Sequence, residues 1–182
     1  MSKGEFLIAI EDNRISFYPL GQKKIWSVGR PSKDIVPDIK LNSAAVSRRH
    51  GKFQNMDGYW FYIDGKSKNG TFHNDRRIST GIGGRTKPVI LEDGDIFLFG
   101  CGQTPVINNK TAWAVYLAAG YDDIENCRIE DTSSFEDICL TDGKNITKLS
   151  NLKEGTVIKQ SDGMAIYMGN ITYLIGKMKI GK

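Results

Sequence analysis

The chain has 182 residues, of which 40% are hydrophobic and 25% are charged, the composition of an ordinary globular protein. This length suffices for one domain with a generous core, or for one domain and a small addition. No stretch approaches the roughly 18 uninterrupted apolar residues of a membrane span, and charged residues interrupt the first 20 positions, so we expect neither a membrane span nor a signal peptide.

The three cysteines, Cys101, Cys127 and Cys139, are an odd number and include no Cys-x-x-Cys pair. This pattern favours reduced thiols over a disulfide framework, and therefore predicts a cytoplasmic protein. We also expect no metal and no cofactor.

The net charge of +4 is unevenly distributed. Residues 21–90 contain 14 lysines and arginines but only 5 acidic residues, whereas the charges of residues 101–182 nearly balance. Such an excess fits either a solvated basic face or an anionic partner, and charge alone does not choose between them.

Short runs of β-branched and aromatic residues, separated by Gly, Asn, Asp and Pro, predict strands in the first 118 residues. No sustained 3.6-residue apolar period occurs before Gly120, so helices should be short or absent there. Many short strands at close spacing predict an all-β sandwich or barrel. The predicted strands are 6–10, 14–20, 24–28, 38–41, 51–55, 59–63, 71–72, 89–91, 96–99, 106–107 and 112–118.

After Gly120 the sequence becomes acidic and polar, and residues 121–137 are expected to form a loop or a short amphipathic helix. Strands are then predicted at 142–146, 156–159, 164–168 and 171–175. Two short segments repeat faintly: Leu91-Glu-Asp-Gly-Asp-Ile resembles Leu152-Lys-Glu-Gly-Thr-Val, and Asn74-Asp-Arg-Arg-Ile resembles Asp142-Gly-Lys-Asn-Ile. Residues 119–182 are thus interpreted as a small β-rich region.

Four polar clusters occur in order at expected strand ends or loops, where binding residues concentrate. They are Val28-Gly29-Arg30, Val46-Ser47-Arg48-Arg49-His50, Lys68-Asn69-Gly70-Thr71 followed by Asn74, and Leu91-Glu92-Asp93-Gly94-Asp95. Arg30 offers a planar fork of donors for phosphate oxygens, Ser47 a short hydroxyl, Lys68 a further cation, and Asn69 both a donor and an acceptor for a peptide backbone.

This ordered series of Gly-Arg, Ser-Arg-x-His, Asn-Gly-Thr with a following Asn, and Leu-x-x-Gly-Asp resembles the signature of the forkhead-associated (FHA) family, over about residues 5–118. The resemblance implies a twisted β-sandwich of about eleven strands that binds phosphothreonine-containing segments. It divides the chain into an FHA domain at 1–118 and a C-terminal region at 119–182, which resembles a degenerate second FHA-like unit.

By resemblance, Arg30 and Ser47 contact the phosphate, Asn69 contacts the peptide backbone, and Arg48 approaches the ligand from the side. Lys68 stands where the family often has Thr or Ser, so a cation replaces a hydroxyl beside the phosphate. Four further positions match residues that shape the loops: Gly29, His50, Gly70 and Asn74.

Other interpretations of single residues remain open. His50 is a candidate catalytic base or metal ligand, but His73 is the only other histidine and no ligand spacing accompanies it, which favours a buried loop brace. Asn69-Gly70 is also typical of a type I′ hairpin turn. Because no catalytic set or complete phosphate-binding P-loop is recognisable, we predict a protein that is not an enzyme.

The sequence therefore predicts a phosphothreonine reader in Ser/Thr kinase signalling. The alternative is a phosphate-independent interaction module, such as the N-terminal FHA region of a larger assembly like a type VII secretion ATPase. Nucleic-acid binding is disfavoured because aromatic residues do not alternate with the basic ones. Thr132, among acidic neighbours, is either a phosphorylation site or part of an exposed loop.

Overall fold

The computed structural model describes residues 4–79, 86–118, 120 and 124–181. Its residues fall into two compact units, one formed by Gly4–Ala119 and another by the chain from Gly120 onward. Helix in the described residues is limited to one 3-10 turn, η1 (Leu20–Gln22), in line with the expectation of short or absent helices. No described helix is long and apolar enough to cross a membrane.

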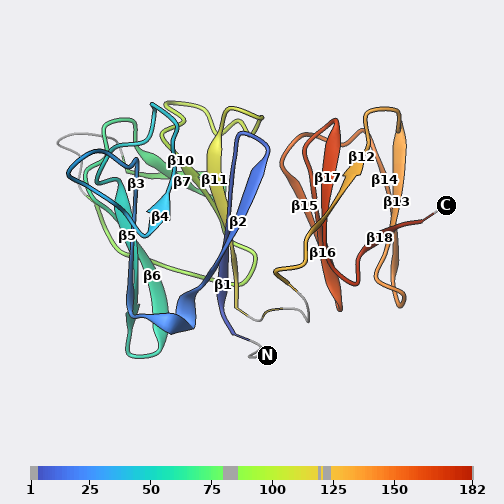
Figure 1. Cartoon of the computed structure of the whole chain (residues 1–182), viewed down its shortest axis with the longest axis horizontal. Helices are drawn as coiled ribbons and strands as arrows, with labels where there is room; N and C mark the ends of the chain where they lie inside the picture. The colour runs from blue at the N-terminus through green and yellow to red at the C-terminus, as the bar shows by residue number, and fades with distance from the viewer. Residues whose placement is uncertain (1–3, 80–85, 119, 121–123, 182) are drawn as a thin grey trace. The chain divides into compact units, whose positions relative to one another are not determined.

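The first unit contains eleven described strands in two sheets (Figure 1). The strands are β1 (Phe6–Glu11), β2 (Arg14–Pro19), β3 (Ile25–Gly29), β4 (Ile39–Lys40), β5 (Gly51–Met56), β6 (Tyr59–Asp64), β7 (Thr71–His73), β8 (Arg76–Ser79), β9 (Val89–Ile90), β10 (Ile96–Phe99) and β11 (Ala112–Leu117). One sheet has the order β2-β1-β11-β10-β7-β8 and the other has the order β4-β3-β5-β6-β9. The unit is the all-β sandwich that the strand pattern predicts.

Alternating side chains from the two sheets form the core of this unit, as the two-residue period of a strand requires. Phe97 and Phe99 from one sheet meet Phe53 and Tyr62 from the other, and the Phe53 and Phe97 rings cross edge to face with centroids 5.3 Å apart. Aromatic pairs in this geometry contribute about 0.5–1.5 kcal/mol beyond area burial. This core fixes the strand ends from which the polar loops emerge.

The structure differs from the strands predicted for the first unit at two places. Residues 106–107 are not a strand, because the Thr111 hydroxyl donates to the Val106 carbonyl at 2.8 Å and holds the segment as a loop. Arg76–Ser79, which the sequence did not single out as a strand, pairs with β7 as β8.

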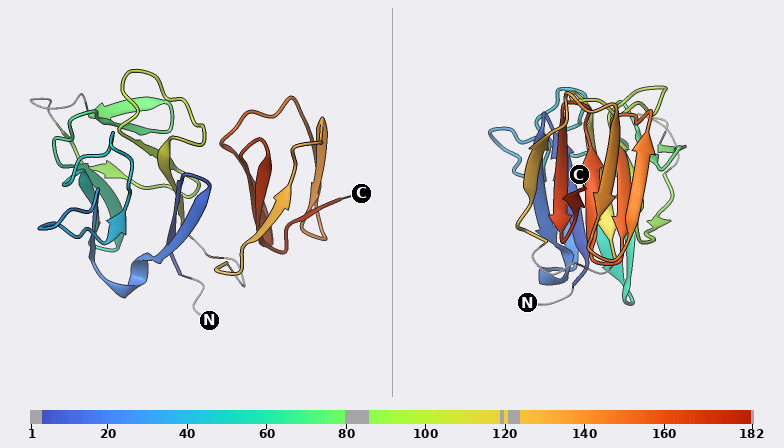
Figure 2. Two further views of the ribbon diagram at one scale, coloured as in Figure 1. Left: turned by 45° about the horizontal axis from the view of Figure 1, so that its top comes forward. Right: turned by 90° about the vertical axis from the view of Figure 1, so that its right-hand side faces the viewer.

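The second unit is also built from two antiparallel sheets, which Figure 2 shows in two further views. Their orders are β12-β17-β16-β15 and β14-β13-β18, and a cluster that includes Ile138, Leu140, Ala165 and Leu174 joins them. The strands are β12 (Arg128–Asp131), β13 (Asp137–Thr141), β14 (Ile146–Ser150), β15 (Thr156–Gln160), β16 (Gly163–Tyr167), β17 (Ile171–Gly176) and β18 (Lys179–Ile180).

Here too the sequence erred at particular places. The loop or helix expected at 121–137 contains β12 instead, although residues 121–123 lie outside the described part. The strand expected at 142–146 is a turn up to Asn145, because the Asp142 carboxylate accepts hydrogen bonds from the backbone N–H groups of Lys144 at 2.9 Å and Asn145 at 2.8 Å. Short Asp side chains that bind the following backbone favour turns over strands.

Thr132 is neither exposed nor in an open loop. Its side chain is buried, and its hydroxyl donates to the Gly169 carbonyl at 2.8 Å. The structure therefore contradicts the interpretation of Thr132 as part of an exposed loop, and a kinase would have to unfold this region to reach the hydroxyl.

The first of the two repeated segments adopts the same local structure in both units. Gly94, just before β10, donates its N–H to the carbonyl of Tyr116 on β11 at 2.8 Å, and Gly155, just before β15, donates to the carbonyl of Tyr167 on β16 at 2.7 Å. The second repeat also forms a hairpin in each unit, but β7 pairs with β10, whereas β13 pairs with β18 and lies in another sheet than β15. The structural similarity is therefore local.

Candidate functional site

Three loops of the first unit are joined directly by hydrogen bonds. They follow β3, precede β5 and follow β6. The Arg30 backbone N–H donates to the Ser47 carbonyl at 3.0 Å, and the Gly65 N–H donates to the His50 carbonyl at 2.7 Å. The Lys68 N–H donates to the Ser47 hydroxyl at 2.9 Å. Residues separated by up to 38 positions are thereby brought into one cluster at the strand ends.

Arg30 leaves the end of β3 partly exposed. Its Nε donates to the Val46 carbonyl at 3.2 Å, which orients the guanidinium beside the Ser47 loop. Gly29 permits this approach, because a Cβ at that position would lie 2.0 Å from the Arg48 carbonyl oxygen. The terminal nitrogens of Arg30 have no hydrogen-bond partner among the described residues. They are available for a planar, charge-assisted interaction with an oxyanion.

Ser47 is held by both its backbone and its side chain. Its N–H donates to Nδ1 of His50 at 3.1 Å, while its hydroxyl oxygen accepts from the Lys68 N–H. A hydroxyl that accepts one hydrogen bond still has its own proton to donate. Ser47 can therefore donate to an anion in front of the loop without losing its attachment to the neighbouring loop.

Asn69 lies next to the same loop, and its side-chain Nδ2 donates to the Ala45 carbonyl at 2.8 Å. Its carboxamide oxygen remains to accept a hydrogen bond from a ligand. Gly70 follows with a φ of +80°, and a Cβ there would lie 2.4 Å from the Ser79 carbonyl oxygen. The type I′ hairpin interpretation is wrong, because Asn69 does not have a positive φ and the segment crosses from one sheet to the other.

His50 is completely buried behind this cluster. Because its Nδ1 accepts from the Ser47 N–H, its proton is on Nε2, which lies 2.9 Å from the Thr71 hydroxyl and 3.2 Å from the Gly70 carbonyl. Burial lowers the pKa of His50 to about 4, although the nearby carboxylate of Asp64 acts in the opposite direction. A neutral histidine with both nitrogens engaged braces two loops, in agreement with the favoured interpretation.

Asp64 is a structural residue that sequence reasoning missed. At the end of β6 its buried carboxylate accepts hydrogen bonds from Ser67 N–H at 2.8 Å, the Ser67 hydroxyl at 2.8 Å, the Thr71 hydroxyl at 2.7 Å and the Ser79 hydroxyl at 2.9 Å. It shapes the loop that presents Lys68 and Asn69. The sequence feature that could have indicated this role is a single Asp between a predicted strand and a glycine.

Glu11 was also missed, and no local pattern could have revealed it. Its carboxylate oxygens accept hydrogen bonds from the backbone N–H groups of Asn42 at 2.6 Å and Ser43 at 2.8 Å, across more than 30 residues of sequence. These two amides lie near the start of the loop between β4 and β5, which contains Ser47. Glu11 thus ties the end of β1 to that loop.

The remaining predicted residues occupy different positions. Arg48 and Lys68 are exposed, and their side chains make no hydrogen bond or ion pair within the described residues. Asn74 lies at the β7–β8 turn, where its side chain accepts from the Ile96 N–H at 2.9 Å and donates to Asp95 at 3.2 Å. It therefore braces this hairpin against β10 and does not join the Arg30, Ser47 and Asn69 cluster.

A hollow of about 400 Å³ adjoins the cluster on the side of Ala45, whose carbonyl holds Asn69. Cys101, Gln103 and Val106 are among its other lining residues. Residues 80–85, between β8 and β9, lie outside the described residues.

Comparison with known proteins supports the family resemblance. Residues 26–100 match the FHA domain family, a segment that includes the Arg30, Ser47 and Asn69 cluster. The resemblance to the FHA family is thus confirmed over residues 26–100, within the first unit.

Among curated proteins, the E3 ubiquitin-protein ligase DMA1 of Saccharomyces cerevisiae is 40% identical over 70 residues, which are 36% of this chain and 17% of that protein. The chain thus spans well under two thirds of this relative.

Solved structures, among them FHA domains, align with the chain at low identity. The yeast Pml1 splicing factor is 20% identical, with a TM-score of 0.50 over 64% of this chain and 83% of that one. The N-terminal FHA domain of S. cerevisiae Rad53p, solved with a phosphothreonine peptide, is 21% identical, with a TM-score of 0.46 over 62% of this chain and 93% of that one.

Proposed function

We propose that the first unit is a non-catalytic module that binds phosphothreonine-containing segments of other proteins, and that it acts in Ser/Thr kinase signalling in the cytoplasm. The observation that carries this proposal is the hydrogen-bonded cluster of Arg30, Ser47 and Asn69 within a segment that matches the FHA family. The cytoplasmic location is supported by three cysteines that are all unpaired.

The proposed binding follows from the donors that the cluster presents. The guanidinium of Arg30 and the hydroxyl of Ser47 donate to phosphate oxygens, and exposed Lys68 and Arg48 add positive charge. The carboxamide of Asn69 bonds to the backbone of the extended peptide. Each charge-assisted hydrogen bond contributes about 1.5–3 kcal/mol, so two or three of them give a dissociation constant of roughly micromolar order.

The proposal is tested by titrating a library of phosphothreonine peptides and their unphosphorylated twins into the protein. We expect phosphorylated members to bind with roughly micromolar affinity, and Arg30→Ala to weaken binding about 10- to 100-fold, the equivalent of one charge-assisted bond. Arg76→Ala is the matched control, because Arg76 is exposed on β8 and its substitution removes the same charge. The proposal fails if no phosphopeptide binds better than its twin.

A second candidate is a phosphate-independent interaction module within a larger assembly. The observation that favours it is the compact second unit, which has two sheets and repeats the turn of the first unit at Gly155. We propose that this unit is a degenerate FHA-like partner of the first. Under this candidate no phosphorylated peptide binds better than its unphosphorylated twin, which separates it from the first candidate in the same titration.

A further inference from the structure

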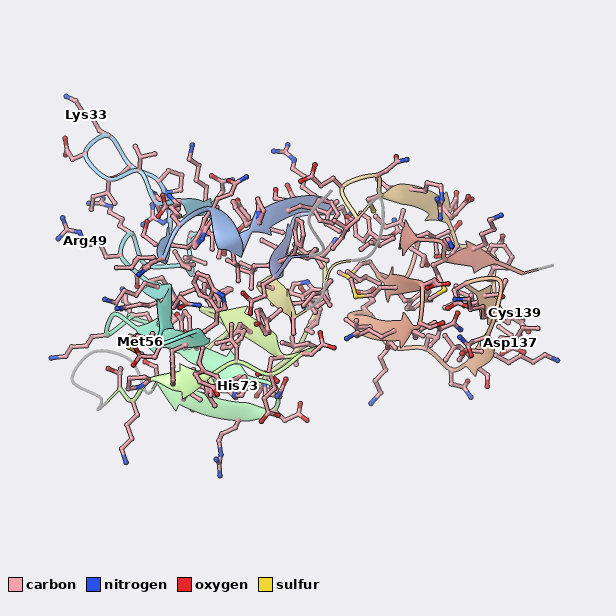
Figure 3. The ribbon with its side chains drawn as sticks, turned by 90° about the horizontal axis from the view of Figure 1, so that it is seen from below. Lys33, Arg49, Met56, His73, Asp137 and Cys139 are labelled. Carbon is pink, nitrogen blue, oxygen red and sulfur yellow. The ribbon has the colours of Figure 1, made fainter. Side chains whose placement is uncertain are left out.

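The loops around the proposed phosphothreonine site carry more positive charge than one phosphate requires. Five cationic side chains on these loops are exposed, in addition to partly exposed Arg30. They are Lys33, Arg48, Arg49, Lys66 and Lys68. Figure 3 shows Lys33 and Arg49 projecting outward from the ribbon. Such a concentration of like charge is unfavourable unless solvent or a ligand compensates it.

The protein itself supplies little compensation within the described residues. None of the five exposed cations forms an ion pair or a side-chain hydrogen bond there. The acidic residues of these loops and of the strand end before the third loop are Asp34, Asp38 and Asp64. The carboxylate of Asp64 is buried and already accepts hydrogen bonds from Ser67, Thr71 and Ser79, and the carboxylate of Asp38 is bound by Lys23 and Ser27. Asp34 is the remaining acid, and it is exposed in the first loop beside Lys33.

Two of the cations lie on backbones that touch. The Gly65 N–H donates to the His50 carbonyl at 2.7 Å, and a Cβ on Gly65 would lie 3.1 Å from the Arg49 carbonyl oxygen. Arg49 and Lys66 are thus carried on adjoining turns. Each is two residues from a residue of the proposed site, Ser47 or Lys68, a Cα separation of at most about 7 Å.

From this juxtaposition we infer that Arg49 and Lys66 form a second anion subsite, which selects peptides carrying a second phosphate or carboxylate group near the phosphothreonine. The inference rests on the proposed function and names its substrate class. A residue two positions along an extended peptide lies about 7 Å away, which is comparable to the upper limit on the Cα separation of these cations from Ser47 and Lys68. Since a phosphate carries about −1.5 to −2 charges and pairs with the planar guanidinium of Arg, a second phosphate fits this subsite better than a carboxylate does.

The test uses the full chain and a peptide series with one fixed phosphothreonine. A second phosphothreonine is placed two to five residues away on either side, and glutamate replaces it in a parallel series. The proteins are the wild type, the double variant Arg49→Gln/Lys66→Gln, and the control Lys52→Gln/Arg76→Gln, which removes the same charge from β5 and β8. Affinities are measured by fluorescence anisotropy at physiological salt.

We expect at least one spacing of the second phosphate to raise wild-type affinity about fivefold or more, and glutamate at that spacing to raise it less. The Arg49→Gln/Lys66→Gln variant should lose this gain yet bind the singly phosphorylated peptide within about threefold of wild type, and the control should keep the gain. No gain at any spacing, or a gain that both double variants reduce equally, overturns the subsite while the proposed function stands. Failure of the singly phosphorylated peptides to bind overturns the proposed function itself.

Discussion

At the scale of single residues, the site depends on side chains that satisfy one another before any ligand arrives. His50 accepts from Ser47 and donates toward Thr71, whose hydroxyl in turn donates to Asp64. This series of hydrogen bonds connects the loop of Ser47 to the loop of Asn69, and each donor in it has an acceptor. A buried network of this kind is rigid when all its members are paired and costly when one of them changes protonation.

The histidine in this network makes stability depend on pH. Burial lowers the pKa of folded His50 to about 4, whereas a histidine in the unfolded chain titrates near 6.5. Between these values the unfolded state binds the extra proton, so the free energy of unfolding falls as the pH drops from about 6.5 to 4 and levels off below that range. The contribution of His50 is about 3 kcal/mol in total.

Urea unfolding between pH 7.5 and 4 measures this dependence. His50→Gln should lower stability at pH 7.5 by about 1–3 kcal/mol, because Ser47 N–H loses its acceptor, and should flatten the decline at acidic pH. If the variant declines with the same slope as the wild type, His50 is not the group that titrates.

At the scale of elements, the site depends on how strand ends are tied to the loops that follow them. Asp64 ends β6 and organises the crossing to β7, and Glu11 ends β1 and holds the start of the Ser47 loop. Both acids act on backbone or hydroxyl donors and not on a cation. Their role is to fix loop geometry before binding, which reduces the ordering cost of a ligand.

Glu11→Gln tests this role at an element that does not carry a predicted ligand contact. A glutamine oxygen accepts only one of the two amides of Asn42 and Ser43, and its NH₂ group opposes the other. We expect phosphopeptide affinity to fall about three- to tenfold, with stability reduced by about 1–2 kcal/mol. Calorimetric titration and thermal melting measure the two effects.

Glu92→Gln is a suitable control for Glu11→Gln, because Glu92 is an exposed acid in another loop of the same unit. Unchanged affinity in Glu11→Gln, together with lowered stability, would show that Glu11 supports the fold without positioning the Ser47 loop.

The motifs of the site were predictable from sequence because they depend on local chemistry. Gly29 and Gly70 lie so close to other backbone atoms that only glycine fits at these positions. Each glycine is adjacent in sequence to a site residue, Arg30 or Asn69, so the pair is recognisable as a short motif. Contacts such as Glu11 to Ser43 join distant positions and leave no local pattern.

The strand predictions failed where side chains override the apolar pattern. Asp142 turns an expected strand into a loop, and Thr111 does the same beside Val106. In the second unit, β12 is exposed at every position and lacks the apolar alternation by which a strand is recognised.

At the scale of the whole molecule, the excess of positive charge and the predicted binding residues both lie in the first unit. The overall net charge is only +4, yet the loops around Arg30, together with Asp64 at the end of β6, hold six cations against three acids. The second unit resembles the first in the Gly155 turn, but its strand order differs. We therefore propose that ligand binding takes place at one end of the first unit, and that residues 124–181 lie outside the binding surface.

The most direct test of this assignment is a map of backbone amide NMR shifts for the full chain, recorded with a phosphothreonine peptide and with its unphosphorylated twin. We predict that the phosphorylated peptide alone produces large shifts, concentrated at residues 29–31, 46–50 and 66–70, with the Lys68 amide among them because it donates to the Ser47 hydroxyl. Shifts concentrated in residues 124–181, or equal shifts with both peptides, would contradict the account.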